Sequence, residues 1–299
     1  MNKKKNHGKR VLSLAFAAIV AAFLFCSTAT FGQDVPYGDL SDARSTTDMI
    51  FMLLQIQADV QGNLTDLDKD VANAAFDLST TGLEGPAARE VLRKLLETNS
   101  NLVQAATFGN EGKIITAEGK ESKGAEGANI SSQEHIAHVL KTKTPTFSKQ
   151  FLLIEGYNGT SLNYPVFSPK GEFIGGISAI IEPDKLMNTL VAPQLHFNTS
   201  TRSNITDYSF WSMHQDGLIA YDRDESQIGK YLFEDPLYRP YPSLLELGKR
   251  IIAKRAGHGN YSFQVTEENE QVVTKDTYWT TAGLHGNEWR LVVTKIMPS

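Results

Sequence analysis

Hydrophobic residues recur every three or four positions from Asp48 to Leu78, and this spacing predicts one long amphipathic helix. Gly62 lies inside the pattern, where it would cost about 1 kcal/mol relative to alanine and could bend the helix. Such a helix is too long for one small sheet, so we expect it to run along two modules or to project from one. A coiled-coil dimer is the alternative. The apolar positions are Leu53, Ile56, Val60, Leu64, Leu67, Val71, Ala75 and Leu78.

Short apolar runs separated by glycine turns predict β-hairpins in the rest of the chain. The turns are Asn110-Glu111-Gly112, Pro169-Lys170-Gly171, Asp216-Gly217 and His285-Gly286-Asn287. Expected strands cover 102–108, 113–117, 146–153, 161–167 and 172–181 in the first half, and 209–214, 218–222, 260–265, 271–277, 278–284 and 288–296 in the second. Shorter helices are expected at 89–97, from Ser131 onward, at 184–190 and at 243–255, the last closed by Gly257.

The same order of elements occurs twice, as a hairpin, a helix and further strands. Both helices follow a capping-box pattern, Ser131 with Glu134 and Ser243 with Glu246, which would satisfy two free backbone donors at a helix start. The repeat predicts the α+β class, with two modules of antiparallel sheet strung along the long N-terminal helix. Expected boundaries are a linker at 33–47, the long helix at 48–80, modules at 81–195 and 209–299, and a second linker at 196–208.

The N-terminus has the composition of an export signal. Basic residues up to Arg10 precede an uncharged apolar run from Val11 to Cys26, and small residues follow at 27–29 and at Gly32. We therefore expect residues 1–32 to be a signal peptide, or an uncleaved membrane anchor, and the protein to be extracytoplasmic. Cys26 is the only cysteine, so no disulfide is expected. Sequons occur at Asn63, Asn129, Asn158, Asn198, Asn204 and Asn260, which would make a glycoprotein only in a host that glycosylates asparagine.

The charge balance argues against a nucleic-acid partner. The chain carries a net charge of −5, and without the five basic residues of the N-terminus 24 basic residues face 34 acidic ones. Nucleic-acid binding requires concentrated positive charge, which no strand or helix after Arg10 supplies. We find no catalytic motif and expect no enzyme and no cofactor. His135 and His138 share a helix face but lack a third ligand, so no metal site is expected.

Several local strings resemble the double Cache (dCache) family of extracytoplasmic sensor domains. They are Tyr164-Pro-Val-Phe-Ser-Pro-Lys-Gly-Glu-Phe-Ile-Gly-Gly176, Asp216-Gly-Leu-Ile-Ala-Tyr-Asp222 followed by Ile228-Gly-Lys230, and Trp279 with the closing run Glu288-Trp-Arg-Leu-Val-Val293. The resemblance covers residues 45–297. It implies two PAS-like modules supported by a long helix, with a small-molecule ligand in the first, membrane-distal module and reversible ligand capture as the function.

Two departures from the family pattern shape the expected function. Members usually continue into a membrane helix and a cytoplasmic output domain, whereas this sequence ends at Ser299, so we expect signalling only through a membrane-bound partner. Amino-acid-binding members carry an Arg-x-Trp-Tyr string and an aspartate near the end of the last strand of the first module. Neither is seen here, since the aspartate position falls on Ile180. Recognition of an amino acid by that device is therefore not expected.

The first module holds the primary candidates for ligand binding. A pocket there would be apolar with a few converging polar groups. Lys149 could hold a carboxylate, and the tyrosines offer apolar faces with hydroxyl groups, so an organic anion is the favoured ligand. The candidates are Phe147, Lys149, Glu155, Tyr157 and Tyr164, with Arg239, Tyr241 and Trp279 as candidates in the second module.

A cell-surface interaction or envelope scaffold that uses the long helix as its interface, including as a homodimer, is the alternative function. The two hypotheses make opposite predictions for residues 53–78. A scaffold requires the apolar stripe to be exposed, whereas a sensor requires it to be buried against the modules.

Overall fold

The computed structural model describes residues 37–119, 122–197, 208–264 and 272–297. Its contacts divide the chain into two compact units, Met1–Arg44 and Ser45–Ser299. Of the first unit only the helical path of residues 37–44 is described, so the predicted signal segment at 1–32 lies outside the described residues, as does most of the predicted linker at 196–208.

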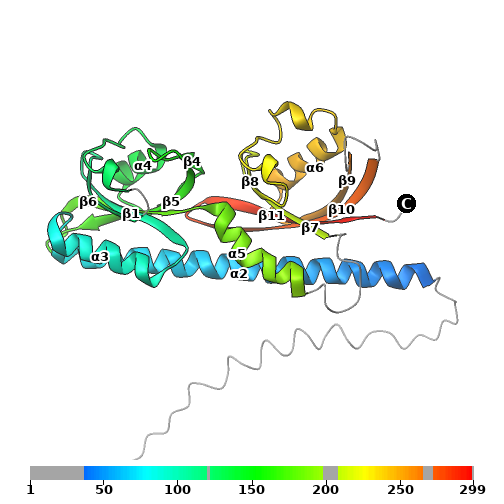
Figure 1. Cartoon of the computed structure of the whole chain (residues 1–299), viewed down its shortest axis with the longest axis horizontal. Coiled ribbons are helices and arrows are strands. Elements are labelled where there is room, and N and C mark those ends of the chain that lie inside the picture. The colour runs from blue at the N-terminus through cyan, green and yellow to red at the C-terminus, as the bar shows by residue number, and fades with distance from the viewer. Residues whose placement is uncertain (1–36, 120–121, 198–207, 265–271, 298–299) are drawn as a thin grey trace, which may run out of the picture. The chain divides into compact units, whose positions relative to one another are not determined.

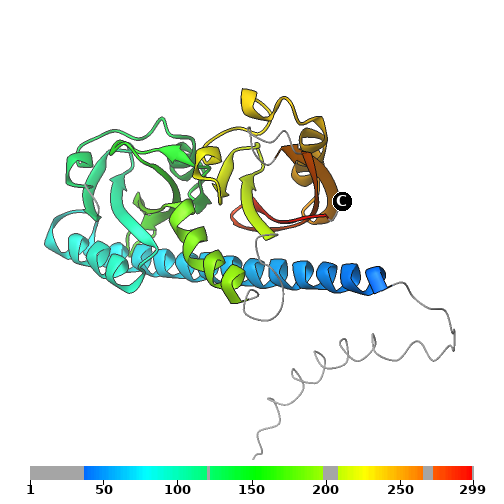
Figure 2. The same cartoon turned by 45° about the vertical axis from the view of Figure 1, so that its right-hand side comes forward.

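One long helix, α2 (Tyr37–Thr81), supports the second unit. It begins well before Asp48, so the described part of the expected linker at 33–47 is helical. Polar composition alone does not stop a helix, and residues 37–47 contain no proline. The predicted apolar stripe is buried, from Leu53 at 4% exposure to Leu78 at 0%. Figures 1 and 2 show α2 running along the faces of both sheets that lie opposite α4 and α6.

The first sheet has the order β2-β1-β6-β5-β3, with β4 paired to β5, and its described pairings are antiparallel. Its strands are β1 (Leu102–Gly109), β2 (Ile114–Gly119), β3 (Thr146–Phe147), β4 (Phe151–Leu152), β5 (Asn158–Phe167) and β6 (Phe173–Ile181). The single strand expected at 146–153 is thus interrupted. Helix α3 (Gly85–Thr98) contacts β1 and β2, and α4 (Glu134–Thr142) contacts β3 and β5.

The second sheet is antiparallel with the order β8-β7-β11-β10-β9. Helix α5 (Pro183–Phe197) precedes it, and α6 (Pro242–Ala253) packs on β9. Its strands are β7 (Tyr208–His214), β8 (Ile219–Asp222), β9 (Gly257–Gln264), β10 (Val272–Leu284) and β11 (Asn287–Ile296). The strands expected at 271–277 and 278–284 are therefore one continuous strand, β10.

Gly257 starts β9 rather than closing α6, and its neighbours explain why glycine stands there. A Cβ atom at Gly257 would lie 2.2 Å from Cζ2 of Trp279, so the close approach of the two strands leaves no room for a side chain.

Both predicted capping boxes are wrong, although both helices exist. Gln133 and Tyr241 are the N-cap residues, and neither side chain makes a capping hydrogen bond. The Ser131 hydroxyl donates instead to the Asn129 side chain at 2.6 Å. The Ser243 hydroxyl accepts from the backbone amide of Ser262 at 3.0 Å, which ties α6 to β9. Tertiary partners have therefore replaced the local capping bonds.

One large core cluster joins α2 to both sheets. It runs from Met49 to Leu78 on the helix and includes Phe147 and Ile177 of the first sheet and Trp289 of the second. Separate clusters lie between the second sheet and α6 and between the first sheet and α4. None of the described helices is both long and apolar enough to cross a membrane.

Candidate functional site

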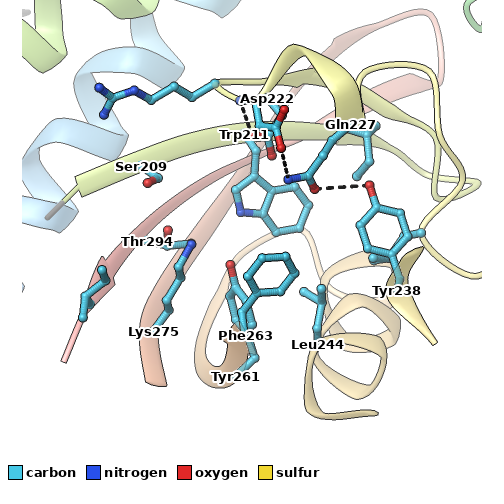
Figure 3. A pocket seen from close by; sticks show the side chains of 15 residues that line it. Ser209, Trp211, Asp222, Gln227, Tyr238, Leu244, Tyr261, Phe263, Lys275 and Thr294 are labelled. Atoms are coloured by element: carbon cyan, nitrogen blue, oxygen red, sulfur yellow. Dashed lines mark hydrogen bonds between the residues drawn. The ribbon is translucent and has the colours of Figure 1, made fainter. Parts of the chain in front are cut away.

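A cavity of about 390 Å³ lies in the second module, where the sheet face meets α6 and the turns that follow β8 (Figure 3). Drug-sized ligands commonly occupy sites of roughly 300–1,000 Å³, so a small organic molecule fits here. The lining residues are Ser209, Trp211, Ile219, Asp222, Arg223, Asp224, Gln227, Leu232, Tyr238, Leu244, Tyr261, Phe263, Lys275, Thr294 and Ile296.

The sheet places aromatic side chains on this face by simple alternation. Ser209 and Trp211 stand two apart on β7, and Tyr261 and Phe263 stand two apart on β9, so each pair projects to the same side. Tyr238, in the turn before α6, adds a further buried ring. In Figure 3 the Trp211 indole lies in the middle of the site, with Tyr238 and Leu244 to one side and Ser209, Thr294 and Lys275 to the other.

Two opposite charges enter the cavity from different strands. Asp222 ends β8 as the cross-strand partner of Trp211, and Lys275 lies on β10 as the partner of Tyr261. Burial raises the pKa of Asp222 to about 6 and lowers the pKa of Lys275. The Asp222 carboxylate accepts a hydrogen bond from the backbone amide of Asp224 at 2.8 Å. Within the described ranges no salt bridge of 4.0 Å or less joins either group to an opposite charge.

A buried donor on the Lys275 side of the cavity has no partner among the described residues. Trp211 is 6% exposed, and its indole nitrogen makes no hydrogen bond. Figure 3 shows this nitrogen on the side of Ser209, Thr294 and Lys275. Ser209 and Thr294 are cross-strand partners on β7 and β11, which brings their hydroxyls to the same place. An indole N–H, two hydroxyls and an ammonium therefore form a corner rich in donors, suited to an anion.

The cavity of the first module is much smaller, at about 40 Å³. That is close to the volume of one or two water molecules. Glu155 lines it and accepts a hydrogen bond from the Gln104 amide at 2.8 Å. The hydroxyl of Tyr157 donates to Gln104 at 3.2 Å. Polar groups that could meet a ligand here are hydrogen-bonded to one another.

The other first-module candidates do not converge on that cavity. Phe147 packs on Trp289, with ring centroids 5.3 Å apart, and Lys149 faces Asp216 at 3.9 Å. Both line a wider cleft that also contains residues from the β10–β11 turn. The Tyr164 hydroxyl donates to Asp68 of α2 at 2.7 Å. Only Glu155 of the five lines the first-module cavity.

The second-module candidates surround the larger cavity without lining it. Trp279 is buried beneath α6 and donates from its indole nitrogen to the Lys254 carbonyl at 2.9 Å. The Tyr241 ring lies 4.4 Å from that of Phe263, a lining residue, and Arg239 is exposed.

Sequence reasoning missed Trp211, Asp222 and Lys275. The pairing of Asp222 with Trp211 and of Lys275 with Tyr261 follows from strand register, which periodicity does not provide. Within the described ranges, no three His, Cys, Asp or Glu side chains gather as metal ligands.

Comparisons with known proteins agree with this architecture. Residues 62–183 match the family model "HK/GC/Chemotaxis protein-like, sensor domain". The solved "Extracellular ligand binding receptor from Desulfohalobium retbaense DSM5692" is similar at 27% identity and a TM-score of 0.67, covering 82% of this chain. This chain spans 39% of that one. A search of curated proteins gives no match.

Two chemoreceptor domains share the fold at low sequence identity. The ligand-binding domain of the Pseudomonas aeruginosa PAO1 amino acid chemoreceptor PctB, in complex with L-Gln, has 14% identity, a TM-score of 0.58, and coverage of 83% of this chain and 89% of that chain. The ligand-binding domain of the Campylobacter jejuni chemoreceptor Tlp3, in complex with 4-methylisoleucine, has 12% identity, a TM-score of 0.60, and coverage of 85% and 91%. The family match and the two-module architecture therefore confirm the resemblance to dCache-type extracellular sensor domains.

Proposed function

We propose that this protein is an extracytoplasmic sensor-type binding protein, which captures a small organic solute reversibly in the second-module cavity. The observation that carries the proposal is the cavity itself, which is open, partly aromatic and lined by opposite charges that no salt bridge joins among the described residues. The resemblance implied a site in the first module. The first-module cavity measures about 40 Å³, and the cleft of about 460 Å³ at Phe147 and Lys149 is shared with the β10–β11 turn. The second module is favoured because its cavity of about 390 Å³ combines aromatic rings with the opposite charges of Asp222 and Lys275.

The fold neighbours support a small ligand. PctB was solved with L-Gln and with L-Arg, and Tlp3 with isoleucine. No catalytic residue is assigned, since the family match and the neighbours are sensor domains.

Occupancy would be reported by a shift in population between two arrangements of the second module. The cavity is covered by α6 and the turns after β8, while the sheet below contacts α2. Gln57 and Gln61 of α2 donate side-chain hydrogen bonds to the backbone of β10 at 3.4 and 3.2 Å. A ligand that draws the cover toward the sheet can therefore act on α2, whose exposed face is open to a membrane-bound partner.

A thermal-shift screen of the purified full-length protein against small organic ions tests this function. A ligand at one hundred times its dissociation constant should stabilise the protein by about 2.7 kcal/mol. Lys275→Met should abolish the shift, and Glu155→Gln, at the first-module cavity, should leave it unchanged. A shift lost in Glu155→Gln and retained in Lys275→Met would move the site to the first module.

One observation favours a second role for α2 as an interface. Although its predicted stripe is buried, which supports the sensor hypothesis, Ile50, Phe51 and Leu54 are exposed, Phe51 at 64%. These residues define a short apolar patch on one face of α2, suited to a second copy of the chain or a partner helix. Light scattering with Phe51→Ser tests for a homodimer. A monomeric wild type would exclude it.

A further inference from the structure

We infer that the second-module cavity takes a small zwitterion whose ammonium and carboxylate groups stand at opposite ends of a short chain, as in an ω-amino acid. The inference rests on the proposed function, because it names the ligand class of the same cavity. It is drawn from the placement of Asp222, Lys275 and Trp211 around one open space.

The positive end of the ligand would meet Asp222. This carboxylate is half-buried, and the hydrogen bonds it accepts come from the backbone, from the amide of Asp224 at 2.8 Å and from that of Arg223. It is the cross-strand partner of Trp211, whose indole lines the same cavity, and aromatic faces attract cations. The neighbouring acid Asp224 is engaged differently, since its side chain accepts from Ser226 at 2.7 Å and from Gln227 at 3.3 Å. Asp222 is therefore the carboxylate available to an ammonium group.

The negative end would meet the donor corner formed by Lys275, the Trp211 indole N–H, and the hydroxyls of Ser209 and Thr294. A buried donor without a partner is costly, and a carboxylate placed here would satisfy the indole N–H. The Lys275 ammonium lies 5.4 Å from the centroid of Phe263 and 5.9 Å from that of Tyr261. These rings hold the ammonium at the cavity and leave its donors for the ligand.

A ligand with a single charge satisfies one side only. A simple anion leaves Asp222 half-buried without a counter-charge, and a simple cation leaves Lys275 in the same condition, each at a cost in desolvation. The order β8-β7-β11-β10 places two strands between Asp222 and Lys275. The backbones of β8 and β10 are therefore three strand spacings apart, or about 14 Å. The distance between the two charged groups is shorter, because both side chains reach into the cavity. The geometry therefore favours charges separated along the ligand over charges on one carbon atom.

Calorimetric titration of the full-length protein with matched ligands tests the inference. The panel is β-alanine, γ-aminobutyrate and 5-aminovalerate, together with butyrate and butylamine, which each lack one charge of γ-aminobutyrate. We expect the best ω-amino acid to bind at least tenfold more tightly than butyrate or butylamine. Asp222→Asn should reduce the preference over butyrate, and Lys275→Met the preference over butylamine. Glu246→Gln, at an exposed carboxylate of α6 that pairs with Lys249 and does not line the cavity, should leave both preferences unchanged.

Different results would contradict the zwitterion ligand and the second-module binding site. If butyrate or butylamine binds as tightly as every ω-amino acid, and Lys275→Met abolishes that binding, the zwitterion inference is wrong while the function stands. If no compound of either panel binds, or if binding is lost in Glu155→Gln and retained in Lys275→Met, both the inference and the second-module site are wrong. Circular dichroism of each variant separates lost binding from lost folding.

Discussion

The burial of Asp222 lowers the free energy of unfolding of the protein at neutral pH. Its carboxylate is half-buried beside aromatic rings, and burial raises its pKa from 3.8 to about 6. A carboxyl group with a raised pKa in the folded state lowers the free energy of unfolding as the pH rises from its ordinary pKa of 3.8 to about 6, because the unfolded state releases its proton first. Binding sites often retain such unfavourable groups because the ligand supplies the missing partner.

Replacing this carboxylate gives the first prediction. Asp222→Asn should raise the free energy of unfolding at pH 7, by about 1 to 3 kcal/mol from a shift of this size. The gain should disappear as the pH falls from 6 to 4, where the wild-type carboxyl becomes protonated. The groups acting on this carboxyl are Asp224, Arg223 and Lys275, and burial is the largest effect. Urea unfolding at pH 7 and pH 4 measures the change.

Asp224→Asn is the matched control. Hydrogen bonds from Ser226 and Gln227 lower the pKa of Asp224, so its ionised form stabilises the fold. The control should therefore lose a little stability at pH 7. Equal effects of the two substitutions would contradict the account of Asp222.

A second prediction at this scale concerns His214. Burial lowers its pKa from 6.5 to about 4, with smaller influences from Asp216 and Lys149. Its contribution to stability is complete above pH 6.5 and is lost as the pH falls toward 4, because the unfolded state then binds the extra proton. His214→Phe keeps a ring against Trp289 and should remove up to about 3 kcal/mol of this acid destabilisation. Unfolding curves with the same acid dependence as wild type would show that His214 is not its source.

The candidate site shows where single-residue reasoning stops. The sequence identified an aromatic and basic set in the second module, including Tyr241 and Trp279. The tyrosine packs on Phe263 at the edge of the cavity, and the tryptophan lies buried beneath α6. Asp222 ends the strand expected at 218–222 and Lys275 lies in the strand expected at 271–277, and nothing in either pattern marks these residues as part of a site. Only the strand order β8-β7-β11-β10-β9 brings both to one cavity.

The sequence predicted which helices and strands exist better than it predicted where each one begins and ends. The helix positions and the glycine-turned hairpins depend on local periodicity and turn chemistry, and both are present in the structure. The start of α2, the continuity of β10 and the N-caps of α4 and α6 were wrong. Ser243 shows the physical reason. Its hydroxyl was expected to accept a hydrogen bond from a backbone amide in the first turn of α6, but it accepts one from the backbone amide of Ser262 in β9.

Two glycines allow the same substitution to be tested with opposite signs. Gly62 lies within α2 with nothing within 4 Å of an added Cβ atom, so Gly62→Ala should stabilise the protein by about 0.5 to 1 kcal/mol. At Gly176 in β6 an added Cβ atom would lie 2.4 Å from Phe108 Cζ and 2.7 Å from the Tyr164 carbonyl oxygen. Gly176→Ala should cost about 1 to 3 kcal/mol. Thermal unfolding measures both, and a neutral result at Gly176 would contradict the close packing of β6 against β1.

At the scale of the whole molecule, α2 contributes to a core that contains residues of both sheets. Because that core is continuous, the second unit should unfold as one cooperative body rather than module by module. Leu64→Ala removes a fully buried side chain from α2 and should lower the free energy of unfolding by about 2 to 5 kcal/mol.

Hydrogen exchange distinguishes shared from separate unfolding. In Leu64→Ala, protection in β6 of the first sheet and in β11 of the second should fall together. Phe76→Ala is the control on the same helix, because Phe76 is 73% exposed and its loss should change little. A fall in protection confined to one sheet would indicate two independent modules.

The central claim is that a small solute is captured in the second module. The most direct measurement is a crystal structure of the protein with the tightest ligand of the titration panel. The account predicts electron density for the ligand between Asp222 and Lys275, against the Trp211 indole. Density beside Gln104 and Glu155 in the first module, with the second-module cavity holding only water, would contradict it.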